Sequence, residues 1–87
     1  MHRILLEEHA FETPGEMHAF LQGALRFPSY YGCNLDALSD CAEDIDEPVR
    51  VLVKRDADSK EEKPWFNKAI RVLKRASKHN PFLDVLE

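Results

Sequence analysis

The stretch "VRVLVKR" (residues 49–55) is the clearest β-strand signal in this sequence. It is rich in β-branched residues and alternates at its outer end, which is typical of a strand. Two shorter strand signals lie near the ends of the chain, in the apolar run from Ile4 to Leu6 and in "FLDVLE" (residues 82–87). Helical patterns separate these three segments, and this alternation determines the predicted fold.

A helical pattern over residues 13–27 precedes the central strand signal. Thr13 is the predicted N-cap, Pro14 suits the first helical position, and Glu16 completes a capping box. The apolar residues of this segment recur at spacings of three and four and form one face: Met17, Phe20, Leu21, Ala24 and Leu25. Pro28 is predicted to end the helix.

A turn and a second helix fill the segment up to the central strand. In the turn "SYYGC" (residues 29–33), Gly32 is the predicted flexible residue. Asn34 then caps a helix over residues 35–45, and Pro48 follows as a stop signal. The buried stripe of this helix consists of residues at helical spacing: Leu35, Leu38, Cys41 or Ala42, and Ile45.

A long helix over residues 64–78 follows the central strand and starts at Pro64. It has a broad apolar face, which we expect to rest on the sheet: Trp65 or Phe66, Ala69, Ile70, Val72, Leu73 and Ala76. "HNP" (residues 79–81) ends this helix before the last strand signal.

The predicted order is therefore strand, helix, helix, strand, helix, strand. Strands separated by helices favour parallel pairing through right-handed crossovers. We expect an α/β fold of two layers, a three-stranded parallel β-sheet with its helices packed mainly on one side. A chain of 87 residues fits one domain, so residues 1–87 are predicted to form a single domain.

The charges are distributed unevenly along the chain. Residues 1–47 carry ten acidic and two basic residues, which sum to −8, whereas residues 48–87 carry six acidic and ten basic residues, which sum to +4. The first half should attract a basic partner and repel nucleic acid. We interpret the basic residues between Lys54 and Lys78 as a solvated helix face, with nucleic-acid binding as the weaker alternative. The acidic face should also repel its own copy, which favours a monomer.

Several classes of protein are disfavoured by the same sequence. No apolar run approaches the roughly 20 residues that span a bilayer, and the N-terminal segment does not have the pattern of a leader, so we expect no membrane association and a cytoplasmic location. Cys33 and Cys41 are too far apart along a helix for a disulfide, and no ligand set for zinc accompanies them. The four histidines are scattered, so we expect no cofactor, no metal and no enzymatic activity.

Residues 28–47, "PSYYGCNLDALSDCAEDIDE", contain six acidic residues and no basic residue. Asp36 and Asp40 are four residues apart and lie on one helix face, Asp44 continues the row, and Glu43 lies one turn beyond Ser39 and Asp40. Like charges at this spacing cost about a few tenths of a kcal/mol per pair. Two interpretations stay open: a well-hydrated helix, or a negative template that docks against arginines and lysines of a partner.

The segment "YYGCNLDALSD" (residues 30–40), with "FP" (residues 27–28) two residues before its first tyrosine, resembles the barstar family of ribonuclease inhibitors, and the predicted order of elements follows that family over the whole chain. The resemblance implies an intracellular inhibitor that plugs the active site of a small basic ribonuclease. It implies that Asp40 takes the place of the substrate phosphate and that Asp36 is the second main acidic contact. Tyr30 matches an aromatic residue that stacks at the cleft, and the remaining predicted contacts are Gly32, Asn34, Ser39, Glu43 and Asp44.

Four positions depart from the best-known member of that family. Ser39 and Ile45 stand where that member has tryptophans, and Arg75 and Cys33 replace acidic residues. Apolar contact area is lost from the helix surface, and one charge at the edge of the interface is reversed. We therefore expect the binding mode to persist with a different partner or affinity. The alternative is a barstar-like module that binds another basic protein and inhibits no nuclease.

Overall fold

The computed structural model describes residues 2–55 and 63–87 of the chain. Strand β1 (His2–Glu7) leads into a short 3-10 helix, η1 (Glu8–Ala10), and helix α1 (Pro14–Ala24) follows. Helix α2 (Leu35–Glu43) precedes the central strand β2 (Val49–Lys54). Helix α3 (Pro64–His79) and strand β3 (Leu83–Leu86) complete the described order.

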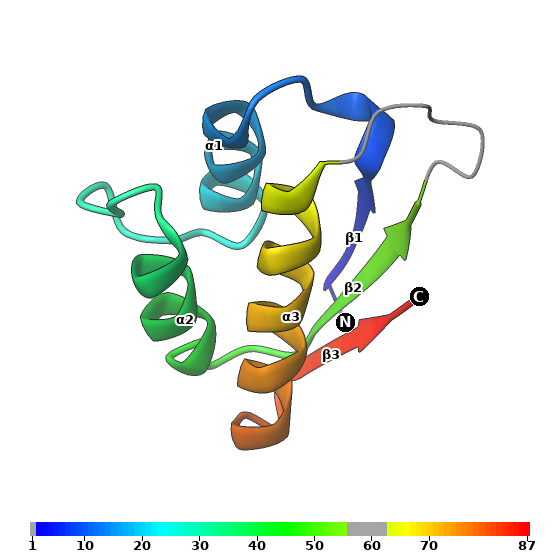
Figure 1. Ribbon diagram of the computed structural model, residues 1–87. Coiled ribbons are helices and arrows are strands. Elements are labelled where there is room, and N and C mark those ends of the chain that lie inside the picture. The colour runs from blue at the N-terminus through cyan, green and yellow to red at the C-terminus, as the bar shows by residue number, and fades with distance from the viewer. Residues whose placement is uncertain (1, 56–62) are drawn as a thin grey trace.

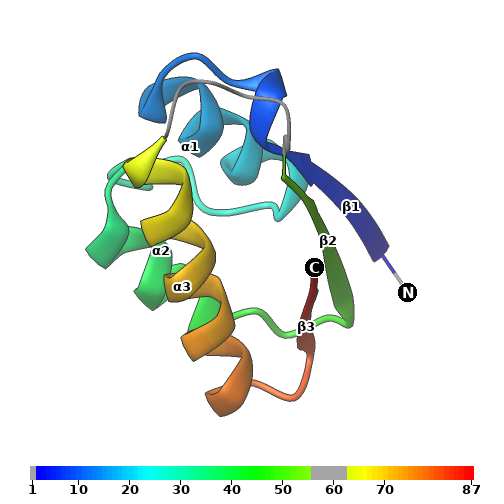
Figure 2. The same cartoon turned by 45° about the vertical axis from the view of Figure 1, so that its right-hand side comes forward.

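The three strands form one parallel sheet in the order β1-β2-β3. Val51 of β2 pairs with Ile4 of β1 on one side and with Val85 of β3 on the other. Figures 1 and 2 show α1, α2 and α3 on the same side of this sheet. The predicted fold, a two-layer α/β structure with a three-stranded parallel sheet, is confirmed.

The hydrophobic core lies between the sheet and the helices. Alternate residues of β1 and β2 point into it, and Leu6 and Val51 are completely buried. Figure 1 shows α3 lying between the sheet and α2. Because α3 packs on both neighbours, its apolar face is broad, and the buried residues are Phe66, Ala69, Ile70, Leu73 and Ala76. The sequence predicted that either Trp65 or Phe66 belongs to this buried face. The structure shows that it is Phe66, whereas Trp65 is half-buried.

Helix α1 starts as predicted but ends earlier. Thr13 caps it by accepting a hydrogen bond from the Glu16 N–H at 3.2 Å. The helix ends at Ala24 rather than at Pro28, because Arg26 adopts a left-handed conformation with φ of 57°. The chain then turns so that Phe27 packs into the core. Prediction from residue spacing alone did not reveal this turn.

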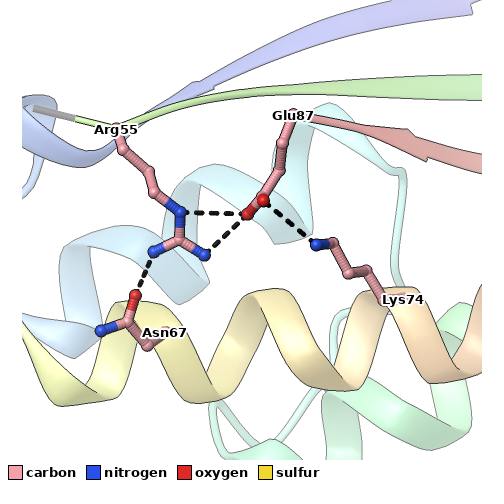
Figure 3. Close-up of polar contacts among 4 residues, drawn as sticks. All are labelled: Arg55, Asn67, Lys74 and Glu87. Atoms are coloured by element: carbon pink, nitrogen blue, oxygen red, sulfur yellow. Dashed lines mark hydrogen bonds and ion pairs between the residues drawn. The ribbon is translucent and has the colours of Figure 1, made fainter.

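A polar cluster joins the end of the chain to β2 and α3 (Figure 3). The Arg55 guanidinium donates from Nε and Nη2 to Glu87 Oε1 at 3.0 and 2.6 Å, and it also donates to the Asn67 side chain. Lys74 Nζ lies 3.1 Å from Glu87 Oε2. The hydrogen bonds from Arg55 and then from Lys74 lower the pKa of the Glu87 carboxyl group.

This lowered pKa predicts a pH-dependent contribution to stability. The contribution is present above the ordinary glutamate pKa and is lost as the pH falls through the lowered pKa of the folded state. We expect Glu87→Gln to reduce the free energy of unfolding at pH 7 by about 0.2–1 kcal/mol, since the groups are partly exposed. Urea unfolding at pH 7 and pH 3 measures this, with the exposed Glu12→Gln as the control. An equal loss at both pH values would contradict the role of the ionised carboxylate.

Candidate functional site

Four carboxylates lie exposed along α2 and at its end. Asp36, Asp40 and Glu43 belong to the helix, and Asp44 is its C-cap residue. None of the four forms an ion pair within the described residues (2–55 and 63–87). The repulsion between these charges is therefore not offset by a cation of the protein itself. A surface of this kind can accept cationic groups from outside without first breaking internal ion pairs.

The loop before α2 is held by its own hydrogen bonds. The Asn34 side chain accepts from the Ala37 N–H at 2.8 Å, which confirms the predicted cap, and donates to the Gly32 carbonyl at 3.2 Å. The prediction that Gly32 supplies the unusual backbone conformation is wrong, because the left-handed residue is Cys33, with φ of 51°. Gly32 matters for a different reason, since a Cβ atom there would lie 3.1 Å from Asn34 Nδ2 and would crowd the capping side chain.

The two adjacent tyrosines have opposite environments. Tyr30 is 84% exposed, whereas Tyr31 is 6% exposed and packs its ring against Phe27 at a centroid distance of 5.0 Å. The Tyr31 N–H donates to the Pro28 carbonyl at 3.0 Å. Tyr31 therefore anchors the loop, and the anchor presents Tyr30 to the solvent beside the acidic helix.

A buried histidine supports this anchor. His18 of α1 is 4% exposed, and its Nδ1 lies 2.6 Å from the Tyr31 hydroxyl oxygen. Burial lowers the pKa of His18 and raises the pKa of Tyr31, so the neutral forms of both are favoured. His18 was not among the residues predicted to matter for the site. Its burial could have been predicted from the sequence, because His18 lies three residues before Leu21 and seven before Leu25 and therefore shares the buried face of α1 with them.

The remaining positions named from the sequence differ in their exposure. Ser39 is half-buried on α2, and Ile45 is half-buried just beyond it, whereas Arg75 is exposed on α3. The thiol of Cys33 is exposed. Burial raises the pKa of the Cys41 thiol, and the negative charges of Asp44 and Asp40 add to this effect.

A pocket borders the acidic surface beyond the end of α2. Its volume is about 420 Å³, and Tyr30, Asp44 and Ile45 contribute to its wall. It therefore extends the surface formed by the acidic helix and the tyrosine loop.

Asn80, which the sequence analysis treated only as part of a helix stop, holds the C-terminal end of α2. Its buried Nδ2 lies 3.0, 3.2 and 2.9 Å from the carbonyl oxygens of Ala42, Glu43 and Ile45. Its Oδ1 accepts from the Phe82 N–H at 2.9 Å. One side chain therefore satisfies the end of the acidic helix and fixes it to the connection between α3 and β3.

We expect Asn80→Ala to reduce the free energy of unfolding by about 1–3 kcal/mol, because it leaves buried backbone groups without partners. Chemical denaturation measures the change. Asn67→Ala is the matched control, since it removes an exposed contact with Arg55 and should have a smaller effect. Equal effects of the two substitutions would contradict the assignment.

In residues 2–55 and 63–87, no group of three or more His, Cys, Asp or Glu side chains is arranged to hold a metal ion. Within the same ranges, no helix has the length and apolar character needed to cross a membrane.

Comparisons with known proteins agree with this architecture. A family model described as "Barstar (barnase inhibitor)" matches residues 1–83. A protein of Bacillus subtilis (strain 168), named "Putative ribonuclease inhibitor YrdF", is 40% identical over 55 residues. The matched segment covers 62% of this chain and 60% of the length of that relative. Since the family model spans almost all of the sequence, this chain belongs to the barstar family.

Proposed function

We propose that this protein binds a small basic ribonuclease and blocks its active site with α2 and the tyrosine loop. The observation that carries the proposal is the row of exposed carboxylates, none of which is paired within the described residues. Membership of the barstar family and the name of the Bacillus subtilis relative support an inhibitor of this class rather than an enzyme.

The chemistry of inhibition in this proposal is mimicry of RNA phosphate. A ribonuclease binds its substrate through cationic side chains, and a carboxylate can form charge-assisted, bidentate hydrogen bonds with the same groups. Asp40 occupies the position of the phosphate, and Asp36 pairs with a second cation. Glu43 and Asp44 extend the negative field, which speeds the encounter with a basic partner.

The loop contributes preorganisation to the proposed interface. Tyr30 supplies exposed aromatic area, and its backbone is held because Tyr31 next to it is anchored in the core. The Asn34 cap holds the first turn of α2, and Asn80 holds its last turn. Binding therefore requires little additional ordering of the backbone, which favours a tight complex.

A second candidate function is a binding module for another basic protein, without inhibition of a nuclease. Two observations favour it. Ser39 offers little contact area between the two main carboxylates, and Arg75 places a positive charge on the exposed surface of α3. Both features change the surface that a partner contacts while leaving the acidic row in place.

Titration of this protein into a barnase-type ribonuclease, with RNA cleavage as the readout, separates the two candidates. Active-site inhibition predicts loss of cleavage at a one-to-one ratio. Added salt should slow the onset of inhibition, because it screens the attraction between the acidic surface and the enzyme. Unchanged cleavage at a large molar excess would contradict inhibition of that enzyme class and favour the second candidate.

A further inference from the structure

A second pocket opens where the first turns of the three helices meet, at the other end of α2. Its volume is about 560 Å³, within the range of sites that hold small organic groups. Leu35 and Trp65 contribute apolar walls, and polar groups come from His18, Asp36 and Lys68. Asn34 also lines the pocket, although its side chain is already engaged in the cap of α2.

His18 provides a buried polar group that has no partner on its pocket side. Its Nδ1 contacts the Tyr31 hydroxyl, but its Nε2 has no hydrogen bond to the residues that the structure describes. Every fully buried side-chain nitrogen or oxygen in this described part has a partner. The unpaired Nε2 is therefore accessible, and the pocket is the space that His18 lines.

The hydrogen-bond partners determine which atom of His18 carries the proton. The buried hydroxyl of Tyr31 has no other acceptor among the described residues, so it donates to His18 Nδ1. Since burial keeps the imidazole neutral, its proton lies on Nε2, and the pocket contains an N–H donor. Asp36 offers a hydrogen-bond acceptor in the same pocket wall, and Lys68 contributes a cationic group there without forming an ion pair with Asp36.

These groups together select a neutral ligand that can both accept a hydrogen bond and donate one. An aromatic ring suits the contact with Leu35 and Trp65. A hydroxyl group on that ring can accept from His18 Nε2–H and donate to the Asp36 carboxylate. We propose that this pocket is a second contact site, which receives the phenol side chain of a tyrosine from the protein partner.

This inference rests on the proposed function in one respect, namely that the partner approaches over α2. Asn34 and Asp36 belong both to the pocket wall and to the predicted partner-binding surface. A partner that covers Asp36 therefore also covers the mouth of the pocket.

Binding of p-cresol, which reproduces the tyrosine side chain, tests the pocket in the free protein. Toluene is the matched control, because it lacks only the hydroxyl group. Trp65 is the single tryptophan of the chain, so its indole N–H signal in ¹H–¹⁵N spectra reports on this pocket directly. We expect p-cresol to shift this signal in a saturable way and to bind about tenfold more tightly than toluene, as one net hydrogen bond requires. Equal binding of the two compounds, or no saturable shift, would overturn the proposal.

Two substitutions locate the binding groups. His18→Phe removes the N–H donor and should abolish the preference for p-cresol. Because His18 is buried, this variant can also lose stability, and its fold must be verified by circular dichroism. Asp36→Asn changes an exposed side chain and should reduce the preference several-fold without loss of folding. A preference unchanged in Asp36→Asn would overturn the proposed hydroxyl contact.

The complex with a ribonuclease that this protein inhibits tests the occupant. If a tyrosine of the enzyme fills the pocket, p-cresol should no longer shift the Trp65 signal in the complex. An unchanged shift would show that the partner leaves the pocket open, and it would overturn the proposed occupant while inhibition still stands. Absence of inhibition would instead overturn the proposed function, and the comparison of p-cresol with toluene would still decide whether the pocket selects a phenol.

Discussion

Asp40→Ala is expected to weaken binding to an inhibited ribonuclease by about 4 kcal/mol, roughly a thousandfold in Kd. Asp40 is exposed near the middle of α2 and forms no ion pair within the described residues. In the proposed complex, its substitution removes the carboxylate that stands in for phosphate and leaves cations of the enzyme buried without a partner. The loss therefore exceeds the value of a surface ion pair.

The same substitution should leave the fold as stable as before, or slightly more stable, because it relieves repulsion from Asp36 and Asp44. Inhibition assays give the binding loss, and urea unfolding gives the stability. Asp46→Ala is the matched control, since Asp46 is exposed and acidic but lies beyond α2. If Asp40→Ala and Asp46→Ala had equal small effects on inhibition, the phosphate-mimic role of Asp40 would be wrong.

Leu38→Ala should have the opposite effects, a loss of stability with the affinity for the ribonuclease retained. Leu38 belongs to α2, two residues before Asp40, and its side chain is completely buried on the inner face of the helix. Truncation leaves a cavity in the core and should reduce the free energy of unfolding by about 2–5 kcal/mol. At temperatures where the variant stays folded, its affinity for the ribonuclease should be nearly unchanged, because the carboxylates on the outer face of α2 remain in place.

Chemical denaturation and the inhibition assay, performed on the same preparation, test this prediction. Leu5→Ala is the matched control, since Leu5 is 48% exposed on β1 and its truncation creates no internal cavity. A small loss of stability at Leu38 would mean that α2 packs loosely on α3. A large loss of affinity in the folded variant would mean that packing beneath α2 sets the position of its carboxylates.

The pattern of the sequence determined the elements and their order. Periodicity and capping signals are local, so Thr13 and Asn34 indicated the starts of α1 and α2 from the residues beside them. The alternation of strand and helix signals then restricted the topology to parallel strands joined by crossovers, as observed. The acidic residues of α2 were equally visible, because their exposure follows from their charge and from the buried stripe on the opposite face.

Only the tertiary structure decided how the proposed site is held in place. Tyr30 and Tyr31 are chemically equivalent neighbours, and their opposite environments depend on Phe27 and on His18 of α1. The role of Asn80 depends on carbonyl groups that lie 35 to 38 residues earlier in the chain. Local sequence cannot specify such contacts, since they exist only after the helices have packed. The sequence by itself thus determined the elements and the charge of the acidic helix. The packing of α1, α2 and α3 determined which tyrosine faces the solvent and how the C-terminal end of the acidic helix is fixed, because these outcomes depend on distances between segments that are remote in the chain.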